Sequence, residues 1–509
     1  MKIFTHPFLS VLLLFALHAV AQDAPPRKTL PLPGGQAPAS PSGPVEATWE
    51  SVRENYHTPE WFMDAKFGIF IHWGVYSVAA AGSEWYPRHM YNGMLDYHTK
   101  TWGSPDTFGY KDFIPLFKAE KFNADEWLDI IADAGARYMI PTAEHHDGFA
   151  MYDSDLTRWD AKDMGPRRDI IGELKAAAER RGIHFGVSNH RIENWDFMYP
   201  KKGIKHDLFD PQYADFYGPP QKPQEGNSAM GPSQEEIMDG IVRQAPQSKE
   251  FLEEWLARCE EIFDKYQPEI FYMDNGINSR SLDPYKLRLA QYYYNSALRW
   301  GKEVTLTTKS DAYLYGTVRD FERMSRAPKE LAGYYWQVDD PIGHKFGYVE
   351  GLRLQNARSV VQNLVNNISK NGNLCLNISP KGDGTIPEDQ RQILRKVGEW
   401  LRANGKAVYA TRAWKIYGEG PGVEGHHNKD NIRFTISKDG RSIYAFVLGK
   451  HGSDIVIRSL KKGDCKIKSV TTVADGKKAA YRLAVDGLYI SGVPSAVDSM
   501  PVALHIALR

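Results

Sequence analysis

Cysteine is scarce in this sequence, whose 509 residues include three, at Cys259, Cys375 and Cys465. They are odd in number and far apart, which excludes a disulfide scaffold and a cysteine-based zinc site. A surplus of either charge is also lacking, because 63 Lys and Arg balance 63 Asp and Glu. Proteins that bind nucleic acids usually carry a basic excess that neutralises phosphates. We therefore expect no nucleic-acid partner.

Long hydrophobic runs are lacking as well, apart from a short apolar run at residues 8–17. It follows Lys2 and precedes Ala19-Val20-Ala21, a pattern typical of signal-peptide cleavage. The run is too short to span a bilayer, and no later stretch reaches the roughly 18 uninterrupted apolar residues of a membrane helix. We expect residues 1–21 to be a signal peptide, and the chain to be exported to the periplasm or the cell exterior without membrane insertion.

The organisation of the remaining chain predicts two folded domains. Residues 22–46 are rich in Pro, Gly, Ala and Ser, which predicts a linker. From 47 to 410, short apolar segments alternate with amphipathic ones, as in βαβ units around a parallel sheet. Seven or eight such units predict a (β/α)₈-like barrel, and no Gly-x-Gly-x-x-Gly motif follows the first strand to favour a dinucleotide-binding fold. Short runs separated by Gly, Asp and Asn predict an all-β sandwich at 411–509.

The expected elements of the barrel follow from these periodicities. We expect strands at 67–73, 138–142, 184–188, 269–273, 304–308, 318–321 and 374–378, and helices at 124–134, 169–181, 249–266, 284–300, 355–370 and 387–404.

Polar and aromatic side chains gather where the expected strands end. In a barrel, the residues after each strand line one mouth. Those positions hold His72, Glu84, Trp85, His145, His146, Asn189, His190, Asp274, Lys309 and Glu322, with Tyr272 and Trp336 nearby. Aromatic faces pack on the C–H patches of sugars, and His, Glu and Lys bond to hydroxyl groups. Two carboxylates from different strand ends could act as the nucleophile and the acid/base of a glycosidase.

Four segments carry a resemblance to a known family: FGIFIHWGVYSVAAAGSEWY (Phe67–Tyr86), EHHDGF (Glu144–Phe149), SKNGNLCLNISPKGDGTIP (Ser369–Pro387) and GEWLRANGKAVYATRAW (Gly398–Trp414). Together they resemble the α-L-fucosidases of glycoside hydrolase family 29, over roughly residues 48–415. The resemblance implies a barrel followed by a β-sandwich, and an exo-acting enzyme that hydrolyses terminal α-L-fucosyl residues of oligosaccharides or polysaccharides with retention of configuration. It also implies that no cofactor and no metal takes part.

The resemblance also implies roles for individual residues. Asp274, in the segment FYMDNG, matches the nucleophile of the family. The sugar-binding positions match His72, Glu84, Trp85, His145 and His146. The acid/base lies downstream of the nucleophile in a variable segment, where Glu322 is the best candidate and Asp339, Asp340 and Glu193 are alternatives.

Three positions depart from the family pattern. Asn189 and His190 stand where the family often has an aromatic strand end, Tyr272 stands where it often has Trp, and Lys309 stands where it often has Arg. We expect these residues, together with Trp336, to contact the sugar. The departures could preserve fucose binding or retune the pocket to L-galactose, because an apolar pocket rejects an added hydroxyl only weakly.

Two further functions fit the same residues. A non-catalytic glycan-binding protein would keep His72, Glu84 and His146 without a working acid/base. A metal-dependent hydrolase would use His72, His145, His146 and Asp274 as ligands. No motif specifies the linkage, the leaving sugar or the oligomeric state.

Overall fold

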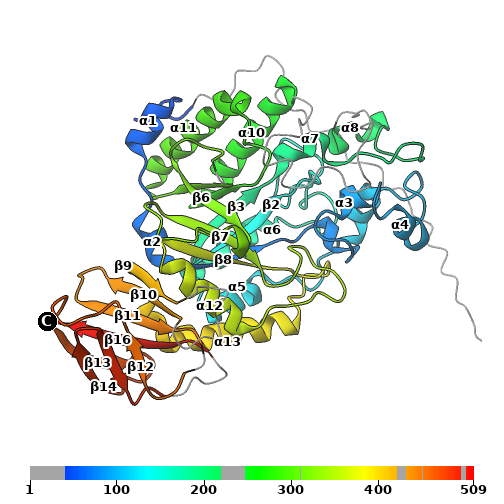
Figure 1. Ribbon diagram of the computed structural model, residues 1–509. Helices are drawn as coiled ribbons and strands as arrows, with labels where there is room; N and C mark the ends of the chain where they lie inside the picture. The colour runs from blue at the N-terminus through cyan, green and yellow to red at the C-terminus, as the bar shows by residue number, and fades with distance from the viewer. Residues whose placement is uncertain (1–39, 219–246, 310, 421–430, 450, 495–499) are drawn as a thin grey trace, which may run out of the picture.

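The architecture is a closed barrel joined to two antiparallel sheets (Figure 1). The computed structural model describes residues 40–218, 247–309, 311–420, 431–449, 451–494 and 500–509. The expected fold, a (β/α)₈-like barrel followed by an all-β sandwich, is confirmed. The predicted signal peptide and most of the predicted linker lie outside the described residues. No helix among the described residues is long and apolar enough to cross a membrane.

Eight parallel strands close the barrel in sequence order, because β1 pairs with both β2 and β8. The strands are β1 (Phe67–Ile71), β2 (Tyr138–Glu144), β3 (His184–Asn189), β4 (Ile270–Met273), β5 (Thr305–Lys309), β6 (Thr317–Glu322), β7 (Trp336–Pro341) and β8 (Gly372–Ile378). Every residue of β1, β2, β4, β5 and β8 is buried. Strands of a parallel barrel are covered on both faces, which explains why they read as continuous apolar runs in the sequence.

The helices of the outer layer match the predicted ones to within a few residues. The larger ones are α5 (Ala124–Asp133), α6 (Ile170–Arg181), α10 (Lys249–Tyr266), α11 (Asp283–Trp300), α12 (Ala357–Ile368) and α13 (Glu388–Asn404), and the shorter ones are α1 (Trp49–Asn55), α2 (Glu60–Ala65), α3 (Tyr86–His89), α4 (Leu95–Thr101), α7 (Asn194–Phe197) and α8 (Ala214–Tyr217). Their ends follow the sequence signals: the Asn123 side chain accepts from the N–H of Glu126 and caps α5, and left-handed Gly182 ends α6.

The barrel departs from eight regular units between β5 and β7. The described residues 311–316 and 323–335 contain no α-helix. Helix α1 covers this side instead: the Trp49 ring meets Tyr313 edge-on at 5.6 Å, and the Tyr56 hydroxyl lies 2.8 Å from Thr305 Oγ1. Just before α1, Val45 is buried, and its backbone N–H and carbonyl each form a hydrogen bond with the Asn295 side-chain amide. The N-terminal segment is therefore held to the barrel from Val45 onward.

The C-terminal sheets have a core of their own and pack on the barrel. The larger sheet has the order β13-β16-β11-β10-β9 and the smaller one β12-β15-β14, with bounds β9 (Thr411–Glu419), β10 (Ile432–Ser437), β11 (Ser442–Val447), β12 (Ile455–Ile457), β13 (Ile467–Thr472), β14 (Ala480–Ala484), β15 (Gly487–Ser491) and β16 (Val502–Leu508). Most residues of β9 are half-exposed, and its burial pattern shows no alternation. Gln362 of α12 donates to the Leu448 carbonyl, and Trp400 of α13 donates to that of Pro501.

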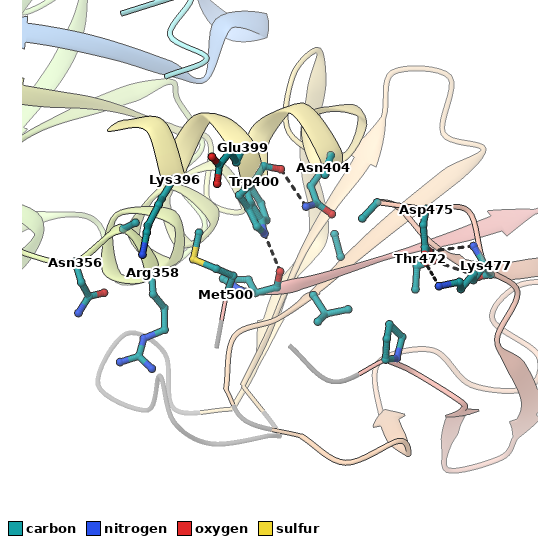
Figure 2. A pocket seen from close by; sticks show the side chains of 17 residues that line it. Asn356, Arg358, Lys396, Glu399, Trp400, Asn404, Thr472, Asp475, Lys477 and Met500 are labelled. Atoms are coloured by element: carbon teal, nitrogen blue, oxygen red, sulfur yellow. Dashed lines mark hydrogen bonds and ion pairs between the residues drawn. The ribbon is translucent and has the colours of Figure 1, made fainter. Parts of the chain in front are cut away.

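A cavity of about 640 Å³ lies beside α13, where the barrel meets the C-terminal sheets (Figure 2). Trp400, Lys396, Asp475 and Met500 are among the residues that line it. None of the residues predicted for a sugar site lines this cavity, so it is distinct from the mouth of the barrel.

Candidate active site

The carboxyl ends of the strands bring most of the predicted residues together at one mouth of the barrel. His72 follows β1, His145 and His146 follow β2, His190 follows β3 and Asp274 follows β4, while Lys309 and Glu322 end β5 and β6. The rings of His145 and His146 are 4.3 Å apart, and those of His145 and His190 are 4.7 Å apart. The common mouth is a direct consequence of parallel strands.

Asp274 is the central carboxylate of this mouth. Its Oδ2 lies 3.0 Å from Nδ1 of His190 and 3.6 Å from Nε2 of His146, and its Oδ1 lies 3.8 Å from Nζ of Lys309. Burial by itself would raise the pKa of Asp274, but His190 and Lys309 hold that pKa well below its ordinary value. Asp274 is therefore an ionised carboxylate at neutral pH, as a nucleophile requires.

Hydrogen bonds fix the tautomer of two histidines. Nδ1 of His72 lies 2.7 Å from Oδ1 of Asn377, whose amide donates to the Phe346 carbonyl, so His72 donates through Nδ1. Nδ1 of His146 lies 3.1 Å from the His190 carbonyl and also donates. Burial, followed by the effect of His190, lowers the pKa of both histidines to about 3. Both rings are neutral at pH 7, and their Nε2 atoms are acceptors for hydroxyl groups.

This burial predicts how stability depends on pH. The pKa of His72 and of His146 is about 3 in the folded protein and about 6.5 when unfolded, so the unfolded chain binds more protons between these values. The free energy of unfolding should be highest above pH 6.5 and fall below it, by about 1 kcal/mol per pH unit for each histidine. Urea unfolding between pH 7 and 4 measures this, and His72→Asn should flatten the slope. His57→Asn is the matched control, because that side chain is 76% exposed; an equal flattening by both variants would contradict the assignment.

Glu84 and Trp85 reach the same mouth from the loop after β1. Oε2 of Glu84 accepts the N–H of Gly347 at 2.8 Å, and burial raises the pKa of Glu84. A Cβ on residue 347 would lie 2.6 Å from the Glu84 nitrogen, so only glycine permits this approach. The half-exposed Trp85 ring meets the His146 ring edge-on at 5.8 Å and can offer a face to a sugar.

Lys309 lies between the carboxylates that were predicted to react. Its Nζ is 3.8 Å from Oδ1 of Asp274 and 4.0 Å from Oε2 of Glu322. The two carboxylate oxygens are therefore no further apart than the sum of these distances. The same Nζ lies 2.9 Å from Oδ1 of Asp320 and 2.7 Å from Oδ1 of Asp339. Lys309 is thus tied to acidic groups, rather than left open as a sugar-binding donor.

The four candidates for the acid/base differ in their surroundings. Glu322 is buried at the mouth, 4.0 Å from Lys309. Oε2 of Glu193 lies 3.2 Å from Nδ1 of His146, and burial together with the Asp274 charge raises the pKa of Glu193 well above its ordinary value. Asp339 is engaged with Lys309, and Asp340 accepts from the N–H of Met324 and from Gln355. Glu322 and Glu193 are therefore the two candidates next to the site.

Asp320 is a functional candidate that sequence reasoning missed. Along β6 the buried residues alternate, so that Val318, Asp320 and Glu322 are buried while the residues between them are half-exposed. The same alternation in the sequence, together with Glu322 as a site residue, could have placed Asp320 on the inner face. The predicted Tyr272 lies beside it, fully buried, with its hydroxyl 3.3 Å from Oδ1 of Asp320.

Two of the predicted sugar contacts have other roles in the structure. The prediction for Trp336 is wrong: it is the first residue of β7, lies at the amino end of the barrel, is fully buried and donates to the Lys370 carbonyl. Trp336 thus lies where β7 begins, whereas the prediction of a sugar contact placed it near the strand ends at the mouth. Asn189 accepts the N–H of Arg191 through its side chain, which commits this oxygen to the turn after β3.

Two groups of side chains could hold a metal ion by their spacing. They are His72, His145 and His190, and His146, His190 and Asp274, with one ligand atom of each residue within 4.8 Å of the others. Both ring nitrogens of His190 already face polar partners, Asp274 and Ser188, each at 3.0 Å. A metal bound to His190 would therefore have to displace one of these hydrogen bonds.

An eight-stranded barrel whose mouth gathers an ionised carboxylate, further acidic groups and neutral histidines has the groups that a glycoside hydrolase uses. Residues 35–406 match the family model described as alpha-L-fucosidase, so the chain belongs to the α-L-fucosidase family. It is 32% identical to the plasma alpha-L-fucosidase of Homo sapiens over 398 residues, 74% of each chain. It is 27% identical to the alpha-L-fucosidase of Dictyostelium discoideum over 455 residues, 85% of this chain and 86% of that one.

Solved structures agree with this membership. The Thermotoga maritima alpha-fucosidase in complex with fucose has a TM-score of 0.71 and 29% sequence identity, and the match covers 91% of this chain and all of that one. The predicted resemblance and the assignment as a glycoside hydrolase are confirmed.

Proposed function

We propose that this protein is an exported, exo-acting α-L-fucosidase that removes terminal α-L-fucosyl residues from glycans with retention of configuration. Asp274 is the nucleophile and Glu322 is the general acid/base. The observation that carries the proposal is the position of Lys309 Nζ, 3.8 Å from Asp274 and 4.0 Å from Glu322. The resulting upper limit on the separation of the carboxylates admits both the ~5–5.5 Å of retaining glycosidases and the lower end of the ~6.5–9.5 Å range of inverting ones, so retention is proposed from the resemblance to the family.

The reaction proceeds in two displacements. A carboxylate oxygen of Asp274 attacks the anomeric carbon, while Glu322 gives its proton to the glycosidic oxygen and the bond to the leaving group breaks. Glu322, now a carboxylate, then takes a proton from water as the water oxygen attacks the anomeric carbon. The ester bond to Asp274 breaks, and the sugar leaves with its original configuration.

Neutral histidines give the pocket its preference for hydroxyl donors. The Nε2 atoms of His72 and His146 accept from sugar hydroxyls, because the other nitrogen of each ring is spent on Asn377 or the His190 carbonyl. Trp85 supplies an aromatic face for the C–H side of the ring. A neutral sugar ring fits this site better than a charged one, because the acidic and cationic groups of the site already pair with each other.

Hydrolysis of an aryl α-L-fucoside is the test of this function. The purified enzyme should release the phenol and give α-L-fucose as the first sugar product, as followed by proton NMR before mutarotation. Aryl α-L-galactoside in parallel tests the alternative specificity, and aryl β-L-fucoside is the negative control. Initial β-L-fucose would contradict retention, and faster turnover of the galactoside would favour the alternative. Export is tested by the N-terminus of the secreted chain, which should be Gln22.

A metal-dependent hydrolase is the second candidate, favoured by the two groups of histidines and Asp274. Its distinguishing property is loss of activity on chelation, because a Lewis acid would activate the water. Under the proposed mechanism, dialysis against EDTA should leave the rate unchanged, since the attacking group is Asp274 itself. Loss of activity that returns with added Zn²⁺ would favour the metal enzyme.

A further inference from the structure

A closed network of polar side chains lies beneath the two proposed catalytic carboxylates. It consists of Lys309, Asp320, Asp339, Tyr272 and Gln337, all of them buried. Lys309 Nζ donates to Oδ1 of Asp320 at 2.9 Å and to Oδ1 of Asp339 at 2.7 Å. Gln337 Nε2 donates to Oδ2 of Asp320 at 2.9 Å. Two carboxylates and one ammonium group are an unbalanced set for a buried site unless one acid keeps its proton.

The hydrogen-bond donors at each carboxyl oxygen indicate which of the two aspartates keeps that proton. Oδ1 of Asp320 and Oδ1 of Asp339 both lie within 2.9 Å of the same Lys309 Nζ, so the two buried carboxyl groups are close together and one of them must keep a proton to balance the charge. Each oxygen of Asp320 has a donor that cannot accept, Lys309 Nζ at Oδ1 and Gln337 Nε2 at Oδ2. At Asp339, Lys309 Nζ occupies Oδ1, whereas Oδ2 has only the Tyr272 hydroxyl at 3.4 Å, an oxygen that can also accept a hydrogen bond. Asp339 is therefore the acid that keeps the proton, at Oδ2. Burial, followed by the Asp320 charge, raises the pKa of Asp339 well above its ordinary value, in agreement with this assignment.

We propose that Asp320 and Asp339 are positioning residues for the reaction: ionised Asp320 and protonated Asp339 together hold Lys309 between Asp274 and Glu322. This proposal rests on the function proposed above. Two N–H groups of Lys309 are occupied by the aspartates, which leaves the third for the two catalytic carboxylates at 3.8 and 4.0 Å. Lys309 thereby stabilises the charge on Asp274 before attack and the charge on Glu322 after it gives up its proton.

The proton on Asp339 gives the network its electrostatic effect. With Asp339 protonated, Lys309 and Asp320 cancel, and no net negative charge lies behind the catalytic carboxylates. With both aspartates ionised, a net negative charge would face Asp274 and Glu322 across a few ångströms of low-dielectric protein. Repulsion would then favour a protonated, unreactive nucleophile.

The same chemical change at the two aspartates tests the proposal. In Asp339→Asn the amide mimics the protonated acid, since its oxygen can accept from Lys309 and its NH₂ can donate to the Tyr272 hydroxyl. In Asp320→Asn, either orientation of the amide sets an NH₂ group against Lys309 or Gln337. We expect kcat for an aryl α-L-fucoside to fall less than about 3-fold in the first variant and more than about 30-fold in the second. Equal losses, or the reverse order, would overturn the proposal.

A double-mutant cycle separates positioning from a merely structural role. If Asp320 acts through Lys309, then Lys309→Met and Lys309→Met/Asp320→Asn should have the same kcat/KM within about 3-fold. Independent, multiplying losses would overturn the proposal. Thermal unfolding of each variant shows which variants are folded. If Asp320→Asn does not fold, a loss of kcat above about 30-fold in folded Asp339→Asn still contradicts the proposal.

A spectroscopic measurement distinguishes this proposal from the proposed function. The infrared difference spectrum between wild type and Asp339→Asn at pH 7 should show the carbonyl band of one protonated carboxyl, and that between wild type and Asp274→Asn should not. This readout needs no substrate. A wild-type enzyme without fucosidase activity that still shows the Asp339 band would refute the function alone, and an active enzyme without the band would refute the proton assignment alone.

Discussion

Replacing Asp274 with glycine is expected to lower kcat/KM for an aryl α-L-fucoside by at least about 10⁴-fold, the order of loss seen when a nucleophile is removed from an enzyme. The ester to the sugar cannot form without this carboxylate. The fold should tolerate the change, because the Asp274 side chain is 15% exposed at the mouth and contacts the polar groups of His190, His146 and Lys309 rather than the packed core. Initial rates and circular dichroism of the same preparation measure both effects.

The configuration of the product formed with azide shows which catalytic group the substitution has removed. In Asp274→Gly, azide can enter the vacated space and attack the anomeric carbon directly, with inversion, to give β-L-fucosyl azide. Asp340→Asn is the matched control, because Asp340 bonds to Met324 and Gln355 and should lose less than about 5-fold. Near-normal turnover in Asp274→Gly, or rescue with retention, would remove Asp274 from the role of nucleophile.

The barrel could be predicted because its elements are specified locally. The apolar strands and the amphipathic helices between them give strong periodic signals, and the predicted helix at 249–266 has the bounds of α10. No helix is predicted between the strands at 304–308 and 318–321, and the described residues there contain no α-helix. What could not be predicted is that α1, from far earlier in the chain, covers this side of the barrel. The bounds of β9 could not be predicted, because this half-exposed edge strand shows no alternation of buried and exposed residues.

The site could be predicted in part, because strand ends locate residues without locating their partners. The rule that residues after each strand share a mouth brought His72, His145, His146 and Asp274 together. It could not reveal that Lys309 is held by Asp320 and Asp339, since those contacts depend on side-chain directions across three strands. The roles of Asp274 and Glu322 stay predictions.

Replacing Glu322 with alanine should produce a loss that depends on the leaving group. A glycoside with a poor leaving group needs the proton of the acid, so kcat/KM should fall by about 10²–10⁴-fold, while an activated aryl fucoside should lose far less in the first step. With the activated substrate, the fucosyl ester on Asp274 should accumulate, because no base remains to activate water. A burst of phenol followed by slow turnover measures this.

Azide then gives the opposite stereochemistry to that of Asp274→Gly. It needs no general base, attacks the ester from the face vacated by the leaving group and should yield α-L-fucosyl azide with recovery of the rate. Glu193→Gln is the matched comparison, because Glu193 is the other acidic candidate next to the site and contacts His146 at 3.2 Å. Full activity of Glu322→Ala without azide, combined with azide rescue of Glu193→Gln, would transfer the acid/base role to Glu193. Because the two azide products differ in a single stereocentre, their NMR spectra assign the nucleophile and the acid/base independently of any rate.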